Sequence, residues 1–235
     1  MKKSKRYKLL EEKIEKDKVY DIDEAIALLK ELHSVKFDET VELSGKLGID
    51  VKKIQQPVRG SVVLPHGTGK KVKILVFAQG ENVEKAKNAG ADYVGGQEYI
   101  DKIKNGWLDF DAVVSTPDMM RQVATLGKIL GPRGLMPSPK TGTVTFEIEK
   151  VVNELKKGRV DFKMDREGNI HIPIGKISFS PEQLKENIIT AINAVLSAKP
   201  QGAKGTYIRS LYLSLTMSPS IPLNVSKILQ MVKGI

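Results

Sequence analysis

Two short clusters of side chains in this sequence have the chemistry to recognise a nucleic acid. Lys36, Phe37 and Thr40 bring a cation, an aromatic ring and a hydroxyl group close together. The ring can stack on a nucleobase while the lysine meets a phosphate, a mixed contact typical of RNA recognition. Thr216 and Met217 end an apolar stretch, where the hydroxyl can bond a 2′-hydroxyl group and the thioether can lie against a base. In both clusters an ordinary structural role, as core or as a strand end, stays open.

A stretch rich in glycine and proline, residues 126–137, is a third candidate. Its sequence is LGKILGPRGLMP, and its glycines and prolines fix an irregular backbone. Lys128, Arg133 and the nearby Lys140 are natural phosphate ligands and could line a secondary nucleic-acid surface. The alternative is a structural loop packed by its own apolar side chains, and the chemistry alone favours neither.

The sequence lacks the usual signatures of an enzyme. Residues 65–70, PHGTGK, superficially resemble a phosphate loop, but a lysine and a predicted strand follow where a Walker loop needs serine or threonine and a helix. The turn at residues 79–82 lacks the G-x-G-x-x-G fingerprint, so a dinucleotide site would depend on analogy of fold alone. His33, His66 and His171 are far apart in the sequence, without metal-ligand spacing. No catalytic residue, metal site or cofactor is therefore predicted.

The charge distribution points to a polyanionic partner. The chain carries 38 Lys and Arg against 28 Asp and Glu, a formal net charge of +10. The last acidic residue is Glu186, and only basic charges follow it over the remaining 49 residues. A plain solvated surface is the alternative, but solvated faces usually mix both signs.

Composition sets the class of protein. With 40% hydrophobic and 28% charged residues the chain is expected to be soluble, and no apolar run reaches the roughly 18 residues of a bilayer span. The amino-terminal residues alternate in charge and do not form a secretory signal. Zero cysteines exclude disulfides and fit a reducing cytoplasm. A length of 235 residues favours two domains.

The first and last parts of the chain share one pattern. Helices are predicted at residues 5–18 and after Asp21, and alternation predicts half-buried strands at 40–49 and 58–64. Towards the carboxyl end, strands at 160–164 and 170–174 flank a turn and are expected to be antiparallel. A helix that begins at Pro181 and ends before Pro200, a strand at 207–217 and a short surface helix complete this pattern. The buried helix positions are predicted to be Ile22, Ala25, Ile26, Leu29, Leu32, Leu184, Ile188, Ala191, Ile192 and Val195.

The central part of the chain has a different pattern, in which short apolar strands alternate with helices. The predicted strands are 73–78, 93–94 and 111–115, and the predicted helices are 81–89, 98–104, one after Thr116 and 147–157. Residues 127–143 are predicted to be a loop. Short connections and continuous apolar strands indicate a small parallel sheet with helices on both faces.

We therefore expect a discontinuous α+β domain with an antiparallel sheet, residues 1–66 plus 160–235, interrupted by a Rossmann-like three-layer α/β domain, residues 67–159. The two chain crossings, near 65–70 and 158–161, would form a hinge at Gly67, Gly69 and Gly158.

Several stretches together resemble the bacterial ribosomal protein L1 family over essentially the whole chain. They are residues 36–42, 58–70, 126–137, 168–171 and 216–217. The resemblance implies the two-domain fold just described, with the discontinuous domain as the RNA-binding part. It also implies a structural constituent of the large ribosomal subunit that binds ribosomal RNA in the mobile lateral stalk. Assistance to exit-site tRNA movement and release, and repression of translation of its own mRNA, are implied as well.

Carried over residue by residue, the family's RNA contacts fall on Lys36, Phe37, Thr40, His171, Ser210, Thr216, Met217 and Ser218. Ser218 departs from the family, which usually has glycine after the Thr-Met pair. If that glycine takes a positive φ or lets RNA backbone approach closely, the serine weakens the contact.

The expected function is thus that of a non-enzymatic, cytoplasmic, ribosome-associated RNA-binding protein. Its partners would be large-subunit ribosomal RNA, exit-site tRNA and its own mRNA, without a membrane, and the protein would be monomeric when free of the ribosome. The alternative is a nucleotide- or cofactor-binding α/β enzyme that uses the central domain.

Overall fold

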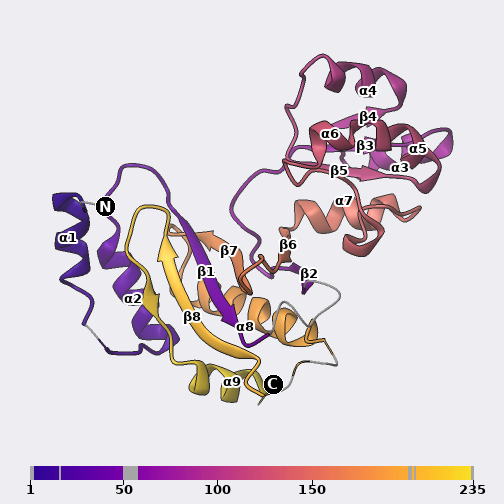
Figure 1. The fold of residues 1–235 in the computed structure, drawn as a ribbon. Helices are drawn as coiled ribbons and strands as arrows, with labels where there is room; N and C mark the ends of the chain where they lie inside the picture. The colour runs from indigo at the N-terminus through magenta and orange to yellow at the C-terminus, as the bar shows by residue number, and fades with distance from the viewer. Residues whose placement is uncertain (1–2, 16, 50–57, 201–202, 204, 234–235) are drawn as a thin grey trace. The chain divides into compact units, whose positions relative to one another are not determined.

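The computed structural model describes residues 3–15, 17–49, 58–200, 203 and 205–233, without the side chains of Lys140 and Lys233. The chain divides into two compact units, which are described separately. Unit 1 consists of Met1–Gly69 and Val160–Ile235, and unit 2 of Lys70–Arg159. Figure 1 traces both units by residue number.

Unit 1 is built on a four-stranded antiparallel sheet of order β7-β1-β8-β9. Its strands are β1 (Thr40–Leu47), β7 (Asn169–Lys176), β8 (Ile208–Leu215) and β9 (Ile221–Pro222). Burial alternates along β1, so that one face is buried and the other is partly exposed. This is the period-two arrangement that the sequence predicts.

Within the described residues, the helices that pack on this sheet share one core with its buried face (Figure 1). They are α2 (Ile22–Leu32), α8 (Pro181–Ser197) and α9 (Val225–Lys233). All ten helix positions predicted to be buried are buried, and they form one core with the inward side chains of the strands. Ser180 caps α8 with a capping box, and Pro181 is its first residue. The carboxyl-terminal helix α9 also contributes to this core, through Ile228 and Val232.

Two predictions in unit 1 are wrong in detail. Helix α1 (Lys5–Glu11) is shorter than the predicted 5–18. The strand β6 (Arg159–Lys163) does not pair with β7 across the turn; it pairs with β2 (Arg59–Val63) in a two-stranded sheet, while β7 pairs with β1. A turn between two strands indicates a change of direction, but it does not determine which strands share hydrogen bonds.

Unit 2 contains a three-stranded parallel sheet of order β4-β3-β5, as predicted. Its strands are β3 (Ile74–Phe77), β4 (Tyr93–Gly95) and β5 (Ala112–Ser115). Alternate residues of β3 enter different core clusters, Leu75 and Phe77 one, Ile74 and Val76 the other. The sheet therefore has a packed layer on each face.

The helical segments of unit 2 are α3 (Glu81–Asn88), α4 (Gln97–Lys104), η1 (Pro117–Met119), α5 (Met120–Val123), η2 (Ala124–Leu126), α6 (Gly127–Leu130), η3 (Pro139–Thr141) and α7 (Ile148–Lys156). The predicted loop at 127–143 is thus partly helical. Leu130 is fully buried at the end of α6, and this burial outweighs the low helix propensity of glycine.

Candidate nucleic-acid interface

The uncovered face of the sheet in unit 1 is polar and crosses three strands. In its middle row Ser44 of β1 lies between His171 of β7 and Tyr212 of β8. The Oγ atom of Ser44 lies 3.1 Å from Nδ1 of His171, and the ring of Tyr212 is 39% exposed. The row thus offers an aromatic face, an imidazole and a hydroxyl to solvent.

The rows on either side extend this face. Lys46 lies between Asn169 and Ser210, and Glu42 lies between Pro173 and Ser214. Glu42 places its Oε1 atom 3.3 Å from Nδ1 of His171, and the charge of this carboxylate would hold a protonated imidazole in place.

One end of the face is closed by a turn that follows β8. The backbone N–H of Met217 donates to Oε1 of Glu39 at 2.9 Å, and Oε2 of Glu39 lies 2.7 Å from Nδ1 of His33. Glu39 is only 1% exposed, so its carboxylate joins the turn to the start of β1 from inside the protein. The N–H of Thr40 donates to Oγ1 of Thr216 at 3.2 Å, which makes a second link between the same two segments.

Phe37 and Met217 project from these two linked segments and are 50% and 45% exposed. Both side chains are large and apolar, so their exposure is a departure from the usual burial of such groups. Lys36 is also exposed and forms no ion pair within the described part of the chain. The predicted combination of ring, thioether and cation is thus present at one end of the sheet and open to solvent.

Two basic residues stabilise this end of the sheet through hydrogen bonds, and neither was predicted from the sequence. Arg6 of α1 donates to the carbonyl oxygen of Met217 at 3.0 Å and to Oγ of Ser34 at 2.9 Å. Lys176 of β7 donates through Nζ to Oγ1 of Thr40 at 2.9 Å and to the carbonyl oxygen of Asp38 at 3.3 Å. Their cations add positive charge beside the exposed apolar pair.

Ser218 has two local roles. Its Oγ atom accepts the N–H of Leu215 at 3.0 Å and donates to the carbonyl oxygen of Pro219 at 3.0 Å. Among described residues other than glycine, only Asp17 has a positive φ, so the serine is not strained at this position. The serine in place of glycine can therefore weaken RNA binding only because its side chain occupies space that an approaching ligand would use.

The sequence-predicted positions of unit 1 lie along β1. Thr40 marks the end with the turn, His171 pairs with Ser44, and Ser210 pairs with Lys46. At about 3.3 Å per residue, the six steps from Thr40 to Lys46 span roughly 20 Å. The predicted residues thus form one elongated surface. Tyr212, in its middle row, and Lys46, at the end away from Thr40, were missed because alternation along a strand shows which face a residue lies on but not which side chains lie beside it.

The turn before β7 shapes the far end of this surface. Asp165 accepts the N–H groups of Asn169 at 2.7 Å and Glu167 at 2.8 Å. These bonds, that from Asn169 above all, hold the pKa of the Asp165 carboxyl below its ordinary value. The ionised carboxylate therefore stabilises the turn from which His171 continues.

The candidate secondary contacts lie in unit 2. Lys128 is exposed on α6, Arg133 is exposed in the following turn, and the side chain of Lys140 lies outside the described structure. From residue 119 to residue 146 the sequence has no Asp or Glu. No carboxylate in this segment can therefore neutralise these cations.

The predicted hinge glycines all have positive φ: 67° at Gly67, 72° at Gly69 and 98° at Gly158. At Gly69 an added Cβ would also lie 2.8 Å from the Cγ atom of Lys176. Asn187, which is fully buried, accepts the N–H of His66 at 3.2 Å and donates to the carbonyl oxygen of Gly67 at 3.0 Å. The chain is therefore anchored to α8 up to Gly67.

Neither a metal centre nor a membrane span is found in the part of the chain that the structure describes. No group of three or more His, Cys, Asp or Glu side chains in the described residues could hold a metal ion. Within the same residues, no helix combines the length and the apolar character needed to cross a membrane.

A half-covered sheet with an exposed aromatic, cationic and hydroxyl-bearing face is suited to RNA binding, because such side chains can stack on bases and bond 2′-hydroxyl groups. Comparison with known proteins identifies the family. Residues 29–219 match the Ribosomal protein L1p/L10e family. The chain is 56% identical over 224 residues to the large ribosomal subunit protein uL1 of a Thermus thermophilus strain, covering 95% of this chain and 98% of the relative. It is 55% identical over 237 residues to the same protein of Persephonella marina, covering 99% and 98%.

The chain belongs to the ribosomal L1p/L10e family. It is therefore a non-enzymatic structural protein of the ribosome, and it is located with the ribosome in the cytoplasm. Family membership contradicts the alternative of a nucleotide- or cofactor-binding α/β enzyme.

Proposed function

We propose that unit 1 binds large-subunit ribosomal RNA through the uncovered face of its sheet and the turn at Thr216 and Met217. The observation that carries this proposal is the exposed pair Phe37 and Met217, held on two segments that the buried carboxylate of Glu39 joins. Because these hydrogen bonds fix the backbone of the two segments, little backbone entropy is lost when a base stacks on the exposed side chains.

The proposed contacts divide by chemistry. Phe37 and Met217 lie against unstacked bases, Thr40, Ser210 and Thr216 bond 2′-hydroxyl groups, and Lys36 neutralises phosphate. His171, in the middle row, donates to phosphate or to a base edge when it is protonated. Ser218 borders the turn and limits how closely RNA backbone approaches.

The decisive experiment is chemical footprinting of the purified protein on large-subunit ribosomal RNA, with wild type and Met217→Ala in parallel. We expect a protected region with unstacked bases, and a loss of protection in the variant at bases that Met217 contacts. Protection that is the same in both proteins would place the RNA on another surface.

At a finer level we propose that the bound RNA belongs to the mobile lateral stalk and that the protein assists exit-site tRNA movement and release. The two chain crossings near 65–70 and 158–161 would act as a hinge between an RNA-binding domain and an inserted α/β domain. Lys128, Arg133 and Lys140, on a segment without acidic residues, would supply secondary phosphate contacts. Arg133→Ala tests this last role, because it should weaken tRNA or ribosomal RNA binding without affecting the unit 1 surface.

We also propose that the protein represses translation of its own mRNA through the same unit 1 surface. One surface cannot hold two RNAs at once, so a ribosomal RNA fragment should compete with the mRNA. A translation assay with added fragment tests this point: repression should be relieved in proportion to the occupied protein. Repression that persists at saturating fragment would require a separate mRNA site.

A further inference from the structure

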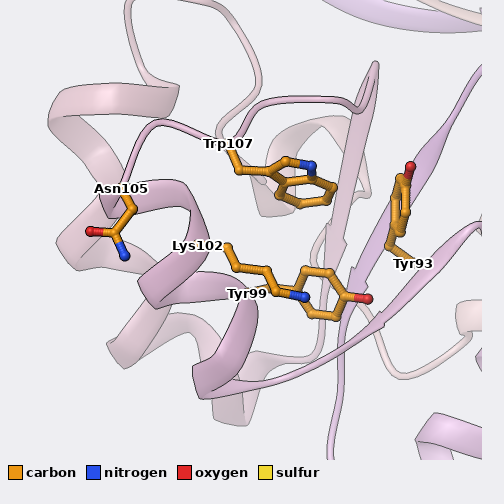
Figure 2. Close-up of a pocket in the computed structure, with 5 residues that line it drawn as sticks. All are labelled: Tyr93, Tyr99, Lys102, Asn105 and Trp107. Carbon is orange, nitrogen blue, oxygen red and sulfur yellow. The ribbon is translucent and has the colours of Figure 1, made fainter.

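Three aromatic rings meet around an open pocket in unit 2. The ring centroids of Tyr93 and Trp107 are 4.9 Å apart, those of Tyr99 and Trp107 5.5 Å, and those of Tyr93 and Tyr99 6.1 Å. Lys102 and Asn105 complete the lining of a pocket of about 450 Å³. Figure 2 shows the three rings around a common space, with Lys102 and Asn105 at the end of α4.

Core packing accounts for only part of this arrangement. The three rings are partly buried against the core cluster that includes Leu75 and Ile100. Their remaining surfaces face the pocket and solvent. Rings held in this way are a preformed stacking platform, because packing fixes their orientation while part of each π-system stays accessible.

The charges at the rim determine which ligand fits. The Nζ atom of Lys102 lies 4.7 Å from the centroid of the Tyr99 ring, and this exposed lysine has no ion pair within the described residues. It therefore repels a cationic ligand, which three aromatic rings would otherwise suit, and attracts phosphate. The carboxylate of Asp109 does not cancel the attraction of Lys102 for phosphate, because Lys73 balances its charge. The Nζ atom of Lys73 donates to the two carboxylate oxygens at 2.7 and 2.8 Å.

The position of the pocket separates it from the usual cofactor site of an α/β fold. Tyr93 begins β4, and Trp107 lies shortly before β5, so the pocket is at the amino ends of the parallel strands. Dinucleotides bind such sheets at the carboxyl ends. The pocket has no glycine-rich loop to hold a pyrophosphate. Apart from the polar atoms of its aromatic rings, its lining residues provide a single lysine and a single amide, and the hydroxyl of Tyr93 already donates to Asp109 at 3.2 Å.

We propose that this pocket binds an unpaired nucleobase of RNA. The base stacks on the rings of Tyr99 and Trp107, Lys102 holds the adjoining phosphate, and the amide of Asn105 bonds the base edge. The inference rests on the proposed function in taking RNA as the partner, but it concerns a different unit and different residues. It gives unit 2 a direct, sequence-tolerant RNA contact of its own.

Trp107 makes the test direct, because it is the only tryptophan of the chain. The full-length protein is titrated with single-stranded hexaadenylate while tryptophan emission is recorded. We expect saturable quenching. The same RNA paired with oligouridylate should quench far less, because its bases are unavailable, and ribose 5-phosphate, which lacks a base, should not quench.

Variants test whether the quenching of tryptophan emission comes from binding in the pocket. Tyr99→Ala and Lys102→Ala should each weaken hexaadenylate binding about tenfold. The matched controls are Phe146→Ala, at a ring that is 58% exposed outside the pocket, and Lys104→Ala, at an exposed lysine of the same helix. Both should bind as wild type does. If Tyr99→Ala fails to fold, Lys102→Glu answers the same question, because it alters an exposed side chain.

The outcomes separate this proposal from that for unit 1. Absence of quenching up to millimolar hexaadenylate, in a protein that still binds ribosomal RNA, would show that the rings are core packing only. If Lys102→Ala and the control variants change the quenching equally, the proposal for the pocket would also be overturned. Quenching that survives in Met217→Ala supports the pocket even if ribosomal RNA binding is lost.

Discussion

The buried carboxylate of Glu39 accepts the backbone N–H of Met217 at 2.9 Å, although 178 residues separate them in the sequence. The same carboxylate lies 2.7 Å from the imidazole of His33. A buried carboxylate is stable only when its oxygens are hydrogen-bonded, and here both are. Glu39 therefore positions the turn of the proposed RNA surface without being accessible to RNA itself.

We predict that Glu39→Ala destabilises unit 1 by about 1 to 3 kcal/mol, because the N–H of Met217 is left without its acceptor. Ribosomal RNA binding should weaken as well, since the turn is no longer fixed. Glu39→Gln should be milder, because its amide oxygen can still accept the N–H. Urea unfolding and RNA titration of the same samples give both quantities. A variant of wild-type stability with intact binding would contradict the positioning role.

Met217→Ala should weaken RNA binding by about 1 to 3 kcal/mol and leave the melting temperature nearly unchanged, because the side chain is 45% exposed. Met231→Ala is the matched control, since Met231 is 39% exposed on α9, away from the proposed surface. Filter binding and thermal unfolding provide the two measurements. Equal affinities of the two variants would remove Met217 from the RNA site. Thr216→Ala is a less direct test, because Thr216 also accepts the N–H of Thr40.

The pattern of the sequence predicted the features that depend on residues close together in the chain, such as which face of an element is buried. Alternation gave the buried face of β1, and helical spacing gave the buried face of α8. It did not predict that β6 pairs with β2, because strand pairing depends on contacts distant in sequence. Residues 127–143 contain glycine and proline and so were expected to form a loop, yet Leu126 and Leu130 supply enough burial for short helical turns.

Phe37 and Met217 were named from their chemistry and from the family resemblance, while a core or strand-end role stayed open for both. Their exposure follows only from the fold. Glu39 and Asn187 could not be named from the sequence, because polar residues are expected outside and their burial depends on partners that only the fold supplies. The same limit explains why Arg6, which braces the turn from α1, was missed.

The salt dependence of RNA binding should identify the phosphate contact. Each neutralised phosphate contributes roughly −0.7 to −0.9 to the slope of log affinity against log salt concentration. Lys36→Ala should therefore make the slope shallower by about one such increment, whereas Met217→Ala should lower the affinity with an unchanged slope. Lys87→Ala, at an exposed lysine of α3, is the control. Identical slopes for Lys36→Ala and Lys87→Ala would remove Lys36 from the contacts.

Acid should destabilise the turn at Asp165. Its pKa in the folded protein lies below its ordinary value, so the ionised form favours folding. This contribution is complete above the ordinary value, near pH 4, and is lost as the pH falls through the lower folded value. Asp165→Asn should therefore flatten the acid limb of the stability curve measured by urea unfolding. Glu167→Gln changes a carboxylate in the same turn and should leave the curve as in wild type. Parallel curves for wild type and Asp165→Asn would contradict this role.

Removal of unit 2 should leave a folded unit 1, provided that the junction keeps the backbone groups that Asn187 bonds. The main core cluster contains only residues of unit 1. A chain that joins residue 69 to residue 160 through a short flexible linker keeps His66 and Gly67, which Asn187 bonds.

A chain joined after Pro65 loses both partners and leaves a fully buried amide with only the carbonyl oxygen of Ile174. We expect the second chain to be less stable than the first by about 1 to 3 kcal/mol. Asn187→Ala in the second chain should remove most of this difference, because the amide that needs the missing groups is then absent. Urea unfolding of the three proteins measures the free energies. Equal stability of the two junctions would show that Asn187 does not anchor the crossing.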